Sequence, residues 1–360
     1  MSTLSTTPLI FSDALSQSLG CDVYLKLEPS HSFKYRGMRH FIEHVKRTKG
    51  ENAHVVIASG GNAAIAVACA ARGVGLRCTA FMPTSTPPAV VDYIRRQGAE
   101  AYLEGAEYYH ALEAAERFVE DDPSRINIPA YNHELVWEGH STIVTEIAGQ
   151  LPSGVVPDSI ICAVGGGGLM GGILTGCKRV GWNSAVPIVS LETHGAASFF
   201  HAFLFNSKKE HQLPPGATTT QPEIDGPKLV TLEAINTKAQ SLGARWVAPG
   251  VLKMALEHPG GVTAVSVRDE DAMLAALEFA DQQKILVELA CATAMTPAYN
   301  PLLAQRLFGN GIQDGKHKTV VFIVCGGFKV ATDDLVSYRE HLQSGNQDKS
   351  PILVNGQTLG

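Results

Sequence analysis

The chain has 360 residues, of which 45% are hydrophobic and 18% are charged, a composition typical of a soluble globular protein with a substantial core. Its formal net charge of -6 is spread along the sequence without a block of lysine or arginine, so no nucleic-acid partner is expected. No segment is apolar for long enough to cross a membrane, and residues 1–17 lack the charged and apolar regions of a signal peptide. The 7 cysteines form no CxxC pair, which favours reduced thiols and a cytoplasmic location.

Short β-branched segments alternate with helical ones along most of the chain. This pattern predicts an α/β fold in which helices cover both faces of mostly parallel sheets. The residues after 344 show no periodic pattern and are expected to be flexible. The predicted strands are residues 54–59, 76–82, 158–164, 186–192 and 319–325, and the clearest predicted helices are residues 87–98 after an N-cap at Thr86, 107–122 and 269–283.

The strand at 158–164 runs directly into four glycines, residues 165–168, and then into a helix. Backbone amides without Cβ atoms at a helix N-terminus form a cradle for an anion, so this turn predicts a phosphate site. Gly166, Gly168 and Gly171 also satisfy the GxGxxG pattern, with Glu192 near the place of a ribose-binding acid. A dinucleotide site therefore stays an alternative, and so does a tight turn without a ligand.

A second glycine-containing turn follows the strand at 54–59 and opens a helix of small residues. Ser59, Asn62 and the amides near Ala63 are able to bind a carboxylate or a ring oxygen. Taken alone, an asparagine at a helix start such as Asn62 is more often only a helix cap without any ligand.

The segment SFKYRG begins another predicted helix, with Ser32 as its N-cap and Lys34 in its first turn. A cation at that end opposes the helix dipole by about 0.3 to 1 kcal/mol, which favours a neutral amine and hence a nucleophilic or Schiff-base lysine. A single lysine without this context would be expected on the solvated surface. The nearby HFIEH, residues 40–44, matches a zinc-protease pattern, but no third ligand is evident and we expect no zinc there.

Together these segments resemble the serine/threonine dehydratase family of fold-type II pyridoxal-phosphate enzymes, in particular the catabolic L-serine dehydratases. The resemblance extends over nearly the whole chain. Several motifs in one order are far more specific than any one of them. In chain order the matching segments are TPLIFS, VYLKLE, SFKYRG, SGGNAA, WEGHSTIV, VGGGGL, ETHGAASF, ILVELACATA and IVCGG.

The resemblance implies a two-domain fold similar to that of tryptophan synthase β, with parallel sheets flanked by helices. It places a large cofactor-binding domain at residues 1–31 and 141–345, a small inserted domain at 32–140 and a flexible tail at 346–360. It also implies a homodimer. No regulatory domain is expected, because the chain ends soon after the IVCGG strand.

The resemblance further assigns a cofactor, pyridoxal 5'-phosphate, bound as a Schiff base to Lys34, the catalytic residue. Phe33 would pack beside the ring, Asn62 would hydrogen-bond its phenolic oxygen, and Cys325 would lie near the pyridine nitrogen. A thiol there leaves that nitrogen neutral, which suits elimination. The full cofactor-binding set is Phe33, Lys34, Asn62, Gly165, Gly166, Gly167, Gly168, Leu169 and Cys325.

The substrate implied by the resemblance is a small amino acid, bound by Ser59, Gly60, Asn62 and Ala63. Position 60 is glycine where the racemases of this family have a serine, so racemisation is not expected. A monovalent or divalent cation is implied at Glu192, Ala196 and Ser198.

The implied reaction is an α,β-elimination, in which an L-serine/L-threonine dehydratase, an ammonia-lyase, forms pyruvate or 2-oxobutyrate plus ammonia. The loop before the lysine lacks a usual insert at residues 29–31, and Leu289, Ala292, Phe328 and Lys329 depart from the family pattern. These departures leave open β-elimination or β-replacement on another substituted amino acid. A non-catalytic pyridoxal-phosphate binder and a nicotinamide-dependent oxidoreductase are the alternatives of another class.

Overall fold

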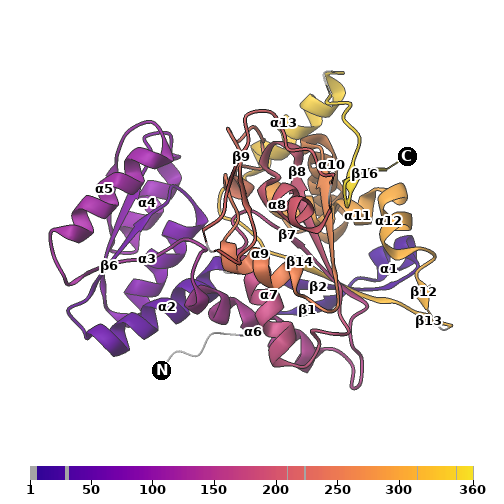
Figure 1. The fold of residues 1–360 in the computed structure, drawn as a ribbon, viewed down its shortest axis with the longest axis horizontal. Coiled ribbons are helices and arrows are strands. Elements are labelled where there is room, and N and C mark those ends of the chain that lie inside the picture. Colours follow the sequence, from indigo (N-terminus) through magenta and orange to yellow (C-terminus); the bar gives the residue numbers. More distant parts are fainter. Residues whose placement is uncertain are drawn as a thin grey trace.

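The computed structural model describes residues 6–28, 32–208, 210–222, 224–313, 315–345 and 347–359. Two sheets dominate the fold, a mixed one of eight strands and a parallel one of four (Figure 1). Within the described ranges, no helix has both the length and the apolar character needed to span a membrane. All seven cysteines are free, as the sequence predicts.

The larger sheet is parallel through its centre and antiparallel at both edges. In spatial order the strands are β1 (Leu9–Phe11), β2 (Asp22–Leu27), β14 (Thr319–Val324), β7 (Ser159–Ala163), β8 (Ile188–Thr193), β11 (Val262–Val267), β15 (Leu353–Val354) and β16 (Gln357–Thr358). Its three central strands, β14, β7 and β8, are buried at every position, which explains why they appear in the sequence as largely apolar runs rather than alternating ones.

The smaller sheet lies entirely between residues 54 and 127, and all its strands are parallel. Its helices are drawn in purple beside the larger group of elements in Figure 1. This arrangement agrees with an inserted domain, whose boundaries at residues 32 and 140 stay a prediction. The strands are β5 (Glu100–Leu103), β4 (Arg77–Met82), β3 (His54–Ala58) and β6 (Arg125–Asn127), and the helices are α2 (Lys34–Lys49), α3 (Asn62–Val74), α4 (Pro88–Arg96) and α5 (Tyr108–Glu120).

All five predicted strands are present, with ends that differ from the prediction by no more than two residues. Two predicted N-caps are wrong. Ser32 pairs with Gly326 as an isolated β-bridge and is therefore extended, so helix α2 begins at Lys34 after Phe33. Helix α4 has Pro87 rather than Thr86 at its N-cap, because two consecutive prolines set the start of the helix.

The remaining elements surround the larger sheet or extend from it. The helices are α1 (Asp13–Leu19), α6 (Glu134–Gln150), α7 (Gly168–Arg179), α8 (Ser198–Ser207), α9 (Pro249–Leu256), α10 (Asp269–Gln283), α11 (Leu289–Tyr299), α12 (Pro301–Phe308) and α13 (Thr332–Gln343). Two short helical turns lie at His194–Ala196 and Gln240–Leu242. Two small two-stranded sheets complete the described chain: β9 (Thr218–Thr220) with β10 (Leu229–Thr231), and β12 (Ile312–Gln313) with β13 (Lys316–His317).

The flexible tail predicted for residues 346–360 is wrong for the part that the structure describes. Strand β15 pairs with β11, and Ile352 and Val354 are buried. Asn355 and Gly356 both have positive φ angles, of 50° and 77°, as a tight hairpin turn requires. The Asn355 side chain also accepts a hydrogen bond of 2.8 Å from the Ala264 amide. The Asn-Gly pair between apolar residues was the overlooked sequence signal for this hairpin.

Candidate active site

A cavity of about 570 Å³ opens where the carboxyl ends of β3, β7 and β14 meet. Such crevices beyond the carboxyl ends of parallel strands are the usual binding sites of α/β proteins. Every residue predicted to bind the cofactor or the substrate lines this cavity, although the three motifs are far apart in the sequence. These residues are Phe33, Lys34, Ser59, Gly60, Asn62, Ala63, Gly165, Gly166, Gly167, Gly168, Leu169 and Cys325.

Lys34 is the first residue of α2, and its Nζ lies 4.4 Å from the centroid of the Phe33 ring. The Phe33 amide donates a hydrogen bond of 3.3 Å to the Cys325 carbonyl, which ties the helix start to the end of β14. Burial lowers the pKa of Lys34, the charges of Cys325 and Glu288 oppose this effect, and Lys329 adds to it. A lowered pKa increases the fraction of neutral amine, the form that acts as a nucleophile or a base.

A buried network of charges holds the first turn of α2 from behind. Arg36 contacts Glu28 at 2.8 Å and Glu146 at 2.6 Å, and Lys26 contacts Glu146 at 2.6 Å. Because Arg36 lies two residues after Lys34, these ion pairs fix the backbone that carries the lysine. The predicted shortening of the preceding loop falls on residues 29–31, which lie outside the described part of the chain.

The glycine turn between β7 and α7 is crowded by side chains that leave no room for a Cβ atom. A Cβ on Gly166 would lie 2.5 Å from the Tyr131 ring, and one on Gly165 would lie 3.1 Å from the Leu242 backbone. Gly167 has a φ of +94°, which favours glycine. The bare amides at the start of α7 therefore form a cradle that fits a phosphate group.

Asn62, the first residue of α3, belongs to a hydrogen-bond network centred on Glu288. Its Nδ2 donates to Glu288 Oε1 at 2.8 Å, and its Oδ1 accepts from the Phe328 amide at 3.0 Å. The Ser241 hydroxyl donates a hydrogen bond to the other Glu288 oxygen, Oε2. The same Asn62 nitrogen also lies 3.5 Å from the Ser241 hydroxyl oxygen, so its two donor hydrogens point toward Glu288 and Ser241, and the bond to Ser241 is the longer one.

The turn after β3 presents small residues and backbone amides to the cavity. The Gly61 amide donates to the Ser59 hydroxyl at 3.3 Å. A Cβ at Gly60 would lie 2.5 Å from the Thr86 hydroxyl, so the turn leaves no space for a larger residue there. This geometry suits a carboxylate bound by backbone amides and the Ser59 hydroxyl.

Two thiols, Cys325 after β14 and Cys291 in α11, meet at the cavity wall. Cys325 directly follows the strand and is buried, and a hydrogen bond to Cys325, together with burial, raises the pKa of Cys291. A thiol is a weak donor and a weak acceptor, so this pair offers a nearly neutral contact to a ring nitrogen.

His140 of α6 forms the wall behind Phe33. The two rings meet edge to face with centroids 4.9 Å apart, and His140 Nδ1 lies 3.1 Å from the Gly168 carbonyl oxygen. Burial lowers the pKa of His140 to about 3, so its ring is neutral at ordinary pH. It packs against the site without adding charge.

The residues predicted to hold a cation lie outside the cavity wall. Both Glu192 oxygens accept hydrogen bonds from the amides of Phe199 and Phe200 in α8, at 2.9 and 2.5 Å. This use of the carboxylate also removes the acid that a dinucleotide site would need for the ribose. Among the described residues, no three His, Cys, Asp or Glu side chains are grouped as metal ligands, so the HFIEH segment gains no support as a zinc site.

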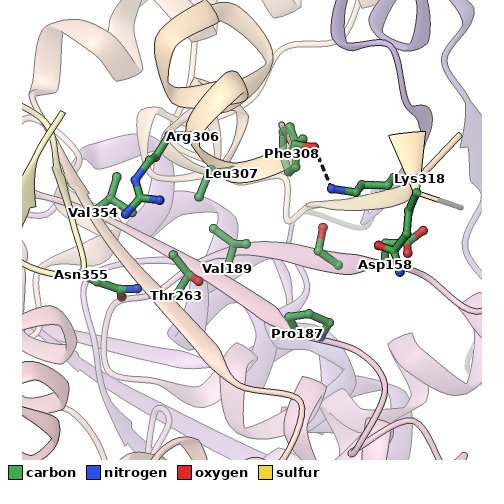
Figure 2. A pocket seen from close by; sticks show the side chains of 12 residues that line it. Asp158, Pro187, Val189, Thr263, Arg306, Leu307, Phe308, Lys318, Val354 and Asn355 are labelled. Atoms are coloured by element: carbon green, nitrogen blue, oxygen red, sulfur yellow. Dashed lines mark hydrogen bonds between the residues drawn. The ribbon is translucent and has the colours of Figure 1, made fainter. Parts of the chain in front are cut away.

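A second cavity, of about 310 Å³, lies at the other end of the parallel strands of the larger sheet, where these strands begin (Figure 2). Asp158 and Pro187 line it near the amino ends of β7 and β8, and Arg306 points toward it from α12. Lys318 in this wall donates a hydrogen bond of 2.8 Å to the Phe308 carbonyl, drawn as a dashed line in Figure 2. None of the predicted site residues lies here.

The prediction from sequence missed three charged residues of the main cavity wall, Arg245, Glu288 and Lys329, as site residues. Glu288 stands in the segment ILVELACATA, directly before Leu289. A carboxylate between an apolar strand-like segment and a buried helix was the available signal.

The fold and the site define an α/β protein with a buried lysine, a four-glycine turn and the turn at residues 59–63 around one cavity. The family described as "Pyridoxal-phosphate dependent enzyme" matches residues 2–326, and the chain belongs to this family. The prediction of this family is therefore confirmed.

Curated relatives match over nearly their whole length. A human protein named "L-serine dehydratase/L-threonine deaminase" is 36% identical over 344 residues, which covers 95% of this chain and 96% of that protein. A human protein named "Serine dehydratase-like" is 38% identical over 339 residues, with 93% and 94% covered.

Solved structures confirm the predicted fold-type II architecture. An L-serine ammonia-lyase from Rhizomucor miehei has a TM-score of 0.79 and 30% identity, and the match covers 93% of this chain and 98% of that one. The processed form of threonine deaminase isoform 2 from Solanum lycopersicum has a TM-score of 0.75 and 25% identity, with 95% and 88% covered.

Proposed function

We propose that this protein is a pyridoxal-phosphate-dependent L-serine/L-threonine dehydratase, an ammonia-lyase that forms pyruvate or 2-oxobutyrate and ammonia. The observation that carries the proposal is the position of Lys34, in one cavity with the glycine turn at residues 165–168 and the turn at residues 59–63. The names of the full-length relatives support the same reaction.

Pyridoxal phosphate, when bound, withdraws electrons from the α-carbon of an amino acid and thereby acidifies its α-proton. The amides at the start of α7 would hold its phosphate, and Lys34 would carry its carbonyl carbon. Asn62 would orient the ring by turning toward it the amide hydrogen that makes the long 3.5 Å contact with Ser241, and Cys325 would face the ring nitrogen.

Lys34 is placed to act as the general base. Its lowered pKa leaves a neutral amine that accepts the α-proton, and Phe33 and His140 shield it from solvent on one side. Ser59 and the amides of Gly60 to Ala63 would bind the substrate carboxylate. Fixing the carboxylate orients the α-proton and the departing hydroxyl relative to the lysine.

A cation at Glu192, Ala196 and Ser198, a homodimer and a cytoplasmic location are parts of the same proposal. The Glu192 carboxylate is buried without an ion-pair partner among the described residues, and burial raises its pKa. The Ser198 hydroxyl is also buried and has no hydrogen-bond partner in the described part of the chain. These are features that a bound cation would relieve.

Turnover of L-serine and L-threonine tests the proposal. The purified protein with its cofactor is expected to release one oxo acid and one ammonia for each amino acid consumed, and Lys34→Ala is expected to release neither. A protein that binds the cofactor but consumes neither amino acid would contradict the proposed substrates.

A further inference from the structure

Lys329 places a second lysine side chain in the wall of the main cavity. It follows the turn after Cys325, where the resemblance predicts a small polar residue. Its Nζ, Cε and Cδ lie 3.6, 3.7 and 3.9 Å from the position that a Cβ atom on Gly61 would occupy. The ammonium group therefore lies beside the turn at residues 59–63 that is proposed to bind the substrate carboxylate.

The backbone around Lys329 is held in place by the network of the site. The Lys329 amide donates to Glu288 Oε1 at 2.9 Å, and the Phe328 amide donates to Asn62 Oδ1 at 3.0 Å. The Phe328 ring packs against Tyr93 with centroids 4.7 Å apart. These contacts direct the lysine side chain toward Gly61.

The Lys329 ammonium group lies in the cavity wall without a paired carboxylate among the described residues. None of the ion pairs among the described residues includes it. The oxygens of Glu288 already accept from Asn62, Ser241 and the Lys329 backbone amide. The ammonium group is therefore available to an anion that enters the cavity.

We propose that Lys329 recognises a second negative group on the substrate, so the preferred substrates are small β-hydroxy amino acids that also carry an acidic group. This inference rests on the proposed elimination reaction and adds an acidic group to the preferred substrate, so L-serine and L-threonine would be the weaker substrates. The turn at residues 59–63 already offers amides and a hydroxyl to the α-carboxylate. The side chains of serine and threonine carry no charge and would leave the ammonium group unpaired.

Binding of L-aspartate and L-asparagine to the holoenzyme tests this inference, because the two amino acids have nearly the same shape and differ in charge. Neither carries a hydroxyl leaving group, so the shift of the visible cofactor band reports binding. We expect the wild-type protein to bind aspartate about ten to a hundred times more tightly. Lys329→Met should remove this preference and Lys329→Arg should keep it, whereas Lys253→Met, an exposed lysine on α9, should change nothing.

Two results would overturn the inference. One is equal affinity of the wild-type protein for aspartate and asparagine. The other is an equal loss of affinity for both in Lys329→Met, which would assign Lys329 to the α-carboxylate. Release of oxo acid from L-serine is measured in parallel. Selective aspartate binding without serine turnover would support the role of Lys329 and refute the proposed dehydratase substrates, so the two failures differ.

Discussion

The side-chain amide of Asn62 donates a hydrogen bond of 2.8 Å to the carboxylate of Glu288, 226 positions later in the chain. Asn62 begins the helix after β3 of the smaller sheet, and Glu288 precedes α11, which packs on the larger sheet. The bond therefore joins the two halves of the cavity wall. Loss of this hydrogen bond would disturb the alignment of the turn at residues 59–63 with the rest of the site.

Glu288→Gln is expected to lower kcat/KM for L-serine by about tenfold to a hundredfold, because one buried acceptor of this network is replaced by a donor. The Ser241 hydroxyl and the Lys329 amide would compete for the remaining oxygen. Steady-state kinetics measure the effect. Glu257→Gln, at an exposed position after α9, is the control and should match the wild type. Equal kinetics of the two variants would contradict this role of Glu288.

Arg36→Met is expected to lower the free energy of unfolding by about 3 to 5 kcal/mol, because it leaves Glu28 buried without its partner. Urea denaturation measures the change. Arg47→Met, at an exposed position on the same helix, should stay within about 0.5 kcal/mol of the wild type. Adding Glu28→Gln to Arg36→Met should recover part of the lost stability, and no recovery would argue against the unpaired charge as the cause.

The neutral state of His140 predicts a dependence of stability on pH. Its pKa falls from 6.5 to about 3 on folding, so between these values the unfolded chain binds a proton that the folded chain does not. The free energy of unfolding should therefore decrease as the pH falls through this window, by up to about 1.4 kcal/mol per pH unit. Denaturation of the wild type and of His140→Asn between pH 6 and pH 4 measures it. The wild type should have the steeper slope, and parallel slopes would contradict the low pKa.

Gly166→Ala is expected to weaken cofactor binding by about tenfold or more, because its Cβ would lie 2.5 Å from the Tyr131 ring and displace the phosphate cradle. Titration of the apoprotein with pyridoxal phosphate measures the affinity. Gly149→Ala is a matched control, since nothing lies within 4 Å of its added Cβ. Unchanged affinity in Gly166→Ala would show that the turn has room to adjust and does not set the cradle.

Much of the fold could be predicted from the sequence because its signals are local. Buried parallel strands appear as apolar runs, and a glycine run at a strand end marks the phosphate cradle, as residues 165–168 illustrate. The final hairpin also had a local signal, Asn355-Gly356, which a search for helices and long strands passes over.

The charged contacts within the site could not be predicted in the same way. The partners of Glu288 come from residues 62, 241 and 329, and a pattern along the chain does not indicate which of them meet. Glu192 shows the converse limit. Its place at a strand end suggested a ribose-binding acid, whereas its oxygens accept hydrogen bonds from the amides of Phe199 and Phe200 in α8.

Chemical trapping tests the central claim about Lys34 most directly, because the cavity holds a second lysine, Lys329, as an internal comparison. Borohydride reduction of the holoenzyme fixes the cofactor covalently to the lysine that carries it, and peptide mass spectrometry then locates the added mass. The account predicts the pyridoxyl group on Lys34, with no labelling in Lys34→Ala. A label on Lys329, or a cofactor that is removed intact after reduction, would contradict it.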